Sequence, residues 1–100
     1  MKCIEMGLNT EPYWVRGYEI IERWKADNNE EMVSYWEKGI NHSIELRDAI
    51  IAEVEANGGC ELNWSCNGET RFNIHACQWA DAMPQYRFEI ARYRCKVYKN

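Results

Sequence analysis

Four residues in the second half of the chain have side chains that could bind a metal or carry thiol chemistry: Cys60, Cys66, His75 and Cys77. Their spacing is C-x5-C-x8-H-x-C, which is not a usual zinc-site spacing. The hairpin expected for this segment puts Cys60 on its apolar face and His75 and Cys77 on the other face. Because ligands on opposite faces of a sheet cannot surround one ion, we expect no metal and no cofactor.

His75 and Cys77 are two residues apart, so on a strand they would share one face and could touch. A thiol nucleophile also needs an orienting group and donors that stabilise the oxyanion. The sequence offers candidates for neither, and it contains no Gly-rich phosphate-binding loop. We therefore expect no catalytic residues and no enzyme. A small thiol or zinc protein centred on His75 and Cys77 is an alternative.

A second group of side chains could bind anionic ligands, and it consists of Arg87, Arg92, Arg94 and Lys96. Residues 82–100 carry five Lys/Arg against one Asp/Glu, whereas residues 1–81 carry seven against fifteen. With Tyr86 or Tyr93 stacking on bases, the basic segment would form a nucleic-acid-binding domain. We keep this function as an alternative, because the acidic remainder of the chain repels a polyanion at long range.

The element that must position much of the negative charge is a long amphipathic helix, expected over about residues 29–57. At 100° per residue, its apolar side chains share one arc, which holds Met32, Val33, Trp36, Ile40, Ile44, Leu46, Ile50, Ile51 and Val54. Asp27-Asn28-Asn29 caps the start of this helix, and the glycines of Asn57-Gly58-Gly59 end it. The helix would be roughly 40 Å long and would cross the whole domain.

The opposite arc of this helix carries an acidic ridge, which consists of Glu30, Glu37, Glu45, Asp48 and Glu55. A ridge of this length complements a basic groove of the kind that holds nucleic acid. Five Trp and six Tyr add side chains that are favoured at protein interfaces. We therefore expect a small protein-binding module that acts by stoichiometric contact with a protein partner carrying a basic groove.

Short, acidic domains that are rich in aromatic residues resemble phage-encoded accessory proteins. The resemblance is one of general type and rests on no aligned motif. That resemblance implies an inhibitor of a host nucleic-acid-handling or defence complex. Five cysteines, an odd number with no signal peptide, also indicate reduced thiols and a cytoplasmic location. No apolar run approaches the roughly 18 residues of a membrane span, so we expect no membrane partner.

Arg47 lies inside the apolar arc of the long helix, where a guanidinium must be paired or must reach out to water. One interpretation is a buried structural ion pair with Glu61 or Glu89. The other is a functional arginine that faces a ligand between the first helix and the sheet. We favour the structural pair, because buried charges are usually paired.

Two further elements are expected before the long helix. Residues 2–6 form a strand, and a helix follows that is capped by Asn9 or Thr10. Gly17 of that helix and Gly39 of the long helix both face inward. Because glycine has no side chain, the two backbones are expected to approach closely at these positions.

Residues 60–77 are expected to form a hairpin around the loop 66–68, because this register puts the apolar side chains on one face. Residues 86–98 alternate like a strand and change phase at Ile90-Ala91, which indicates a β-bulge; a helix is the alternative. The resulting order is β-α-α-β-β-β over one domain, residues 1–100. We expect a two-layer α+β fold. An antiparallel sheet of three to four strands carries both helices on one face, and its other face is open to a homodimer.

Overall fold

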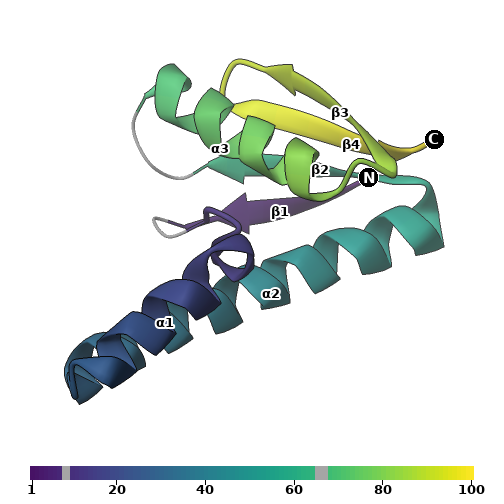
Figure 1. The fold of residues 1–100 in the computed structure, drawn as a ribbon. Helices are drawn as coiled ribbons and strands as arrows, with labels where there is room; N and C mark the ends of the chain where they lie inside the picture. Colours follow the sequence, from purple (N-terminus) through teal and green to yellow (C-terminus); the bar gives the residue numbers. More distant parts are fainter. Residues whose placement is uncertain (8–9, 65–67) are drawn as a thin grey trace.

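The computed structural model describes residues 1–7, 10–64 and 68–100. The elements in these ranges are β1 (Lys2–Met6), a 3₁₀ turn η1 (Tyr13–Val15), α1 (Gly17–Ala26), α2 (Glu30–Asn57), β2 (Gly59–Trp64), α3 (Glu69–Ala82), β3 (Tyr86–Ala91) and β4 (Arg94–Lys99). Figure 1 shows the strands side by side, with α3 packed against them and with α1 and α2 extending beyond them.

The described strands form one mixed sheet in the order β1-β2-β4-β3. β1 is parallel to β2, and the β2–β4 and β3–β4 pairs are antiparallel. The prediction of a wholly antiparallel sheet is therefore wrong at β1. The chain leaves β1, passes through α1 and α2, and returns as β2, and a crossover of this length allows parallel pairing.

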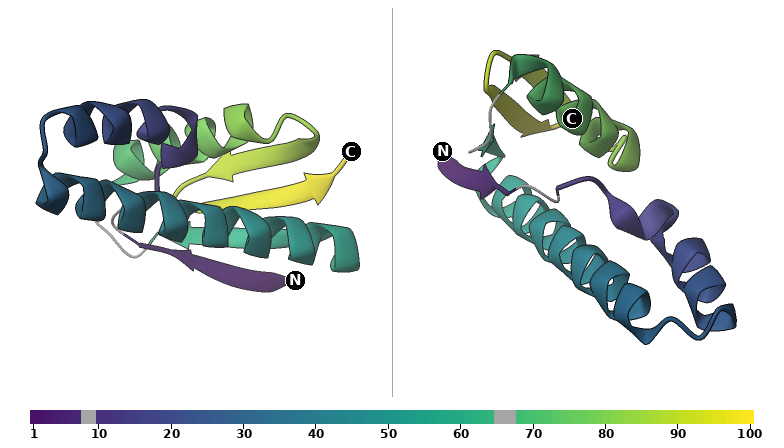
Figure 2. Two further views of the ribbon diagram at one scale, coloured as in Figure 1. Left: turned by 60° about the horizontal axis from the view of Figure 1, so that its bottom comes forward. Right: turned by 90° about the vertical axis from the view of Figure 1, so that its left-hand side faces the viewer.

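One face of the sheet is apolar and supports the core. Ile4 pairs with Leu62, Leu62 with Cys95, and Cys95 with Ile90, so one row of inward side chains crosses all four strands. Both α2 and α3 lie on this side of the sheet (Figure 2). The predicted two-layer α+β architecture is confirmed. The helices that cover the sheet are α2 and α3, however, so the prediction that the first helix covers it is wrong: α1 packs on α2 and η1.

The core is built mainly by α3, the inner face of the sheet and the C-terminal half of α2. Phe72 and Trp79 of α3 and Val54 of α2 have no exposed surface, and Ile50 is 1% exposed. Each buried aromatic side chain removes roughly 150–250 Å² from water. This burial fixes α3 and the C-terminal half of α2 against the same sheet face.

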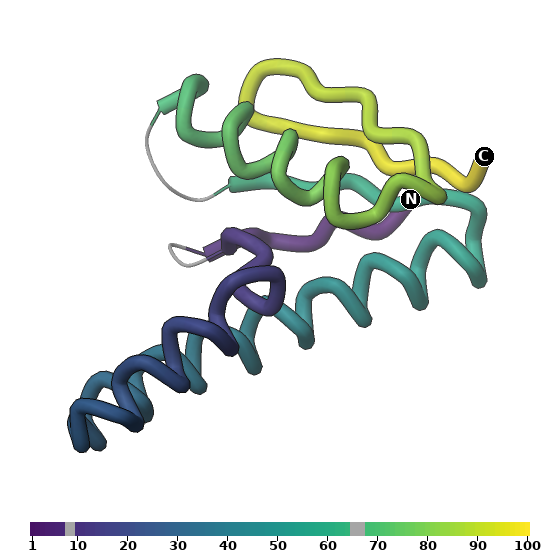
Figure 3. The backbone as a smooth tube through the Cα atoms, viewed as in Figure 1, coloured from purple at the N-terminus to yellow at the C-terminus, as the bar shows by residue number. Residues whose placement is uncertain are grey.

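α2 is the predicted long helix. The Asn29 side chain accepts a hydrogen bond from the Met32 amide at 3.1 Å, and Gly58 ends the helix in the left-handed conformation with φ of 79°. Its 28 residues span about 42 Å at 1.5 Å per residue, close to the 44 Å length of the molecule. Only its C-terminal half lies under the sheet, and its N-terminal half extends away beside α1 (Figure 3).

α1 and the N-terminal half of α2 form an antiparallel helical hairpin that projects from the sheet (Figure 2). A Cβ at Gly17 would lie 2.5 Å from Cδ1 of Ile40, so the predicted close approach of the two helices is confirmed there. Gly39 instead faces the ring of Tyr13, at 3.3 Å from an added Cβ. The two glycines therefore serve two different contacts of α2.

The first helix starts later than predicted. α1 begins at Gly17, after η1, and Asn9 lies outside the described residues. Thr10 does not cap a helix, because it is buried and its hydroxyl lies 3.2 Å from Nδ1 of His75. The segment before α1 is thus held by a contact with α3.

The segment 69–82 is helix α3, so the predicted hairpin over residues 60–77 is wrong beyond β2. The predicted loop 66–68 falls largely on residues 65–67, outside the described residues. Phe72, Ala76 and Trp79 are fully buried, and their spacing is that of one helix face. Ile74, which a strand would place on the same face as Phe72, is 52% exposed.

The segment 86–98 is extended, as predicted, but it forms two strands joined by a turn instead of one strand with a bulge. Ala91 pairs with Arg94, and Tyr93 adopts φ of 55° in the connection. A two-residue turn changes the alternation phase, so Ile90 and Cys95 both point inward. The change of phase at Ile90-Ala91 was therefore the signature of a turn, and the helical alternative is wrong.

No helix in the described residues combines the length and apolar character that crossing a membrane requires.

Candidate functional site

The acidic ridge of α2 is exposed along the whole helix, but its members differ in their partners. Asp48 accepts hydrogen bonds from Arg47 at 3.1 and 3.2 Å. Glu55 lies 2.8 Å from Nζ of Lys99 and accepts a hydrogen bond from the Tyr86 hydroxyl at 2.9 Å. Lys99 and Tyr86 together lower the pKa of the Glu55 carboxyl. The C-terminal part of the ridge is therefore paired within the protein.

The other three members, Glu30, Glu37 and Glu45, are exposed and form no ion pair within the described residues. We call these three residues the acidic face of α2. Consecutive members are seven or eight residues apart, which places them about 10–12 Å apart along the helix. The structure thus narrows the predicted ridge to a row of three unpaired carboxylates.

Glu30 and Glu37 of the acidic face lie on the helical hairpin of α1 and α2, which extends away from the sheet (Figure 2), and Glu45 follows it near the middle of α2. Residues 17–45, which include the hairpin and the whole acidic face, carry seven Asp/Glu against three Lys/Arg. Tyr18 and Tyr35 also lie on the hairpin and are 57% and 58% exposed. The projecting part of the molecule therefore combines negative charge with exposed aromatic side chains.

The surroundings of Arg47 match neither predicted interpretation completely, the buried ion pair or the ligand-facing arginine. Its side chain is 33% exposed and pairs with the adjacent Asp48, while its guanidinium lies 5.3 Å from the centre of the Trp14 ring. Glu61 and Glu89, the predicted partners, lie on the opposite face of the sheet, so the predicted pairs are wrong. Arg47 reaches the edge of the core and packs against η1, which is a structural role.

The basic set near the C-terminus is interleaved with carboxylates. Arg87 lies 3.6 Å from Glu89 and stacks over the Tyr98 ring at 4.9 Å. On the open face of the sheet, Lys96 lies opposite Glu61 of β2 and opposite Glu89 of β3 in the strand register. The four predicted anion contacts, Arg87, Arg92, Arg94 and Lys96, therefore do not form a continuous basic row.

Two details of the nucleic-acid prediction are resolved by the structure. Tyr86 is 8% exposed and bonded to Glu55, so it cannot stack on a base, and that part of the prediction is wrong. Tyr93, in the turn, is 53% exposed and stays a candidate. Arg92 lies 3.8 Å from Glu69 of α3. Nucleic-acid binding through this basic set stays a prediction.

His75 and Cys77 do not share a face, because the segment is a helix and residues two apart point about 200° away from each other. His75 is buried and Cys77 is exposed. Cys60 is a fully buried residue of β2, and Cys66 lies outside the described residues. Within the described part of the chain, no group of three or more His, Cys, Asp or Glu side chains could hold a metal ion.

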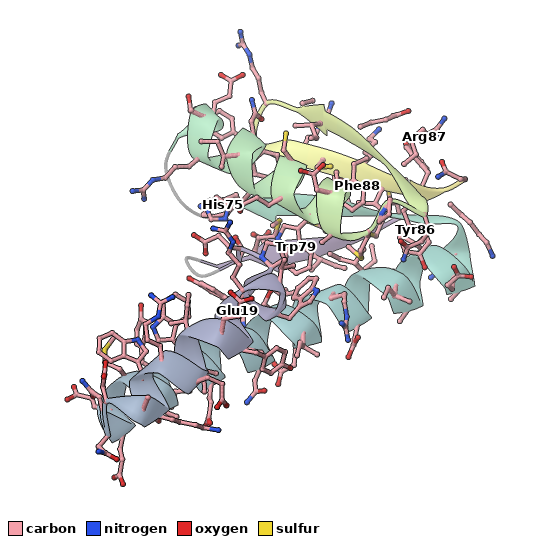
Figure 4. The ribbon with its side chains drawn as sticks, viewed as in Figure 1. Glu19, His75, Trp79, Tyr86, Arg87 and Phe88 are labelled. Atoms are coloured by element: carbon pink, nitrogen blue, oxygen red, sulfur yellow. The ribbon has the colours of Figure 1, made fainter. Side chains whose placement is uncertain are left out.

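His75 instead belongs to a buried polar cluster that the sequence did not reveal. Its Nδ1 lies 3.2 Å from Oγ1 of Thr10, and its Nε2 lies 3.8 Å from Oε1 of Glu11. Ser43 of α2 donates a hydrogen bond to the carbonyl oxygen of Glu11 at 2.7 Å. Figure 4 shows His75 and Trp79 on the same side of α3, toward η1. The cluster fixes the segment before η1 between α2 and α3.

A cleft of about 480 Å³ lies next to this cluster, between α3 and the segment formed by η1 and the start of α1. We call it the α1–α3 cleft. Its lining includes Glu11, Tyr13 and Ile20 on one side, Asp81 of α3 on the other, and Trp36 of α2. These residues are far apart in the sequence, so no local pattern could have identified the cleft.

Comparisons with known proteins give no match: no protein family fits the chain, and no curated protein or solved structure is similar to it.

Proposed function

We propose that the protein acts by stoichiometric binding to another protein and that the acidic face of α2 contacts a basic surface of that partner. The observation that carries this proposal is the state of Glu30, Glu37 and Glu45. They are exposed, they follow one side of a projecting helix, and they form no ion pair within the described residues. A partner would therefore meet a row of charges that the protein itself does not neutralise.

Electrostatics explains why such a row favours a basic partner. Neighbouring carboxylates on this face are about 10–12 Å apart, farther than the Debye length of about 8 Å at physiological ionic strength, so each carboxylate acts mainly on a partner group close to it. Complementary potentials steer association and disfavour acidic partners. The exposed rings of Tyr18 and Tyr35 on the same hairpin supply contact area of the kind that interfaces favour.

The class of partner we propose is a nucleic-acid-handling or defence protein with a basic groove. A helix that presents carboxylates along about 22 Å, from Glu30 to Glu45, has the elongated acidic form that such a groove accepts. Occupation of the groove would exclude nucleic acid, so the protein would act as an inhibitor. This is the mode of action implied by the resemblance in type to phage-encoded accessory proteins.

Two charge-matched variants test the binding surface. Glu37→Gln with Glu45→Gln removes two carboxylates from the acidic face, and Glu5→Gln with Glu89→Gln removes two exposed carboxylates from the open face of the sheet. Both variants change the net charge of the chain by the same amount. Each is immobilised and used to capture partners from a lysate of the cells in which the protein acts, and the captured proteins are quantified by mass spectrometry.

We expect the acidic-face variant to capture about tenfold less of the partner than the unmodified protein, because two complementary contacts are lost. The sheet-face variant should capture as much as the unmodified protein. Equal capture by the two variants would show that net charge, and not the acidic face, determines binding. If only the sheet-face variant failed to capture the partner, the open face of the sheet would be the binding surface.

A further inference from the structure

The α1–α3 cleft has an aromatic wall suited to a flat cation. The rings of Tyr13 and Trp36 meet edge to face, with centres 5.4 Å apart, and both side chains line the cleft. Pro12 and Ile20 add apolar lining. Aromatic faces attract alkylammonium and guanidinium groups through their negative ring faces, and more strongly where water is excluded.

The cleft also has carboxylates on both sides. Glu11 precedes η1, and Asp81 projects from α3. Oε2 of Glu11 is buried and has no hydrogen-bond partner within the described residues. A buried carboxylate oxygen without a donor is unfavourable relative to a bonded one, and the Glu11 side chain as a whole is 36% exposed, so a group in the cleft can reach it. Glu11 therefore stands to gain from a donor that enters the cleft.

The neighbouring His75 does not neutralise Glu11. Nε2 of His75 is 3.8 Å from Oε1 of Glu11, but burial lowers the pKa of His75, so the imidazole is uncharged at neutral pH. Burial and a hydrogen bond to the Glu11 carboxylate raise the pKa of the Tyr13 hydroxyl, which stays protonated and is an uncharged donor beside Glu11. Arg16 also lines the cleft, but it is exposed and forms no ion pair within the described residues.

We propose that the α1–α3 cleft binds an arginine side chain of a protein partner. The guanidinium would lie between the carboxylates of Glu11 and Asp81, and the aliphatic stem would pack on Tyr13 and Trp36. The cleft volume of about 480 Å³ falls within the usual range for ligand sites.

Arginine fits this cleft better than lysine, because its planar group can accept an aromatic face and a carboxylate at the same time. The protein makes such contacts twice within itself, with Arg47 over Trp14 at 5.3 Å and Arg87 over Tyr98 at 4.9 Å. This proposal rests on the proposed function in one respect: the arginine comes from the basic protein partner. The chemistry of the cleft can be tested without that partner.

The test is an NMR titration with two tripeptides, Ac-Gly-Arg-Gly-NH2 and its uncharged analogue in which citrulline replaces arginine. The indole N–H signal of Trp36 and the backbone amide signals of Gln78 and Ala82 report on the cleft. We expect the arginine peptide to shift these signals with a Kd on the order of 1 mM, as for a single side chain. The citrulline peptide should bind about tenfold more weakly or less, because it lacks the charge.

Four variants separate the cleft from general electrostatics. Glu11→Gln and Asp81→Asn should each weaken binding of the arginine peptide about fivefold or more, and Asp81 is exposed, so its variant keeps the fold. Arg16→Gln removes a like charge from the rim and should tighten binding about twofold. The double variant of Glu37 and Glu45 described above should bind the peptide as the unmodified protein does.

The proposal would be overturned if the arginine and citrulline peptides gave equal shifts. It would also be overturned if the arginine peptide, at 20-fold excess over the expected Kd on the order of 1 mM, did not shift the cleft signals. So would unchanged binding in Asp81→Asn. Because the acidic-face variant leaves the cleft intact, failure of the proposed function and failure of the arginine site give different results.

Discussion

His75 lies at the junction of three elements. Its ring is 4.1 Å from the ring of Trp64 in β2, and its Nδ1 bonds to Thr10. The charged groups that act on it are Glu11, which favours protonation, and Arg71, which opposes it. Burial has the largest effect and lowers the pKa of His75 below its ordinary value of 6.5. The folded protein therefore holds this histidine in its neutral form.

The sign of the resulting pH dependence follows from this shift. As the pH falls, His75 binds a proton near pH 6.5 in the unfolded chain and only at a lower pH in the folded protein. Protonation of His75 therefore favours unfolding. The contribution of His75 to the free energy of unfolding is thus complete above pH 6.5. It is lost as the pH falls through that value toward the lower pKa of the folded state.

Urea unfolding at pH 7.5, 6.0 and 5.0 checks this prediction with two variants. His75→Gln should unfold at a lower urea concentration at pH 7.5 and should lose less stability than the unmodified protein between pH 7.5 and 5.0. His42→Gln is the control, because His42 is exposed on α2, and it should keep the unmodified pH dependence. If His75→Gln kept that dependence as well, the buried imidazole would not be its source.

Single residues differed in how far the sequence could place them. The periodicity of α2 correctly predicted that Glu30, Glu37 and Glu45 are exposed. Asp48 is paired with its neighbour Arg47, but the partners of Glu55 could not be foreseen in the same way, because Lys99 comes from β4 and Tyr86 from β3. Local patterns give the face of a helix on which a side chain lies, whereas its charge partners depend on tertiary packing.

At the scale of elements, the contact between α1 and α2 depends on Gly17. An added Cβ would lie 2.5 Å from Cδ1 and 2.7 Å from Cγ1 of the buried Ile40. Gly17→Ala should therefore lower the free energy of unfolding by about 1–3 kcal/mol, as overpacking does in a close contact. Urea unfolding followed by tryptophan fluorescence measures the change.

Gly39→Ala is the matched control for that prediction. Its Cβ would meet the Tyr13 ring at 3.3 Å, which a small movement relieves. Alanine also gains about 1 kcal/mol over glycine inside a helix, so the net change should be within about 1 kcal/mol. A Gly17→Ala variant at least as stable as Gly39→Ala would contradict the close packing of α1 on α2.

The elements that the sequence predicted well have strong local signals. α2 has a long apolar arc, an Asn cap and a terminal glycine, and β1 and β2 are short apolar segments. The sequence did not predict α3, because the apolar residues after Gly68 alternate like a strand that could pair with β2, although Phe72, Ala76 and Trp79 also have the spacing of one helix face. The turn between β3 and β4 was missed because Arg92-Tyr93 lacks the usual Asn-Gly signal.

The whole molecule has two parts with different roles. The sheet, α3 and the C-terminal half of α2 form a packed core, and the helical hairpin of α1 and α2 projects from it (Figure 1). Between these parts lies the α1–α3 cleft, which only tertiary structure assembles. In our account the core supports the hairpin, and the hairpin carries the surface that meets the partner.

The salt dependence of binding to the captured partner tests this account most directly. The Kd of the unmodified protein and of the variant with Glu37→Gln and Glu45→Gln is measured by calorimetry at low and at high salt. Exposed charges are screened within about 10 Å at 0.1 M salt and about 3 Å at 1 M. We predict that the unmodified protein binds about tenfold more tightly at low salt and that the variant loses most of this dependence. The same salt dependence in both proteins would contradict the claim that the acidic face of α2 is the binding surface.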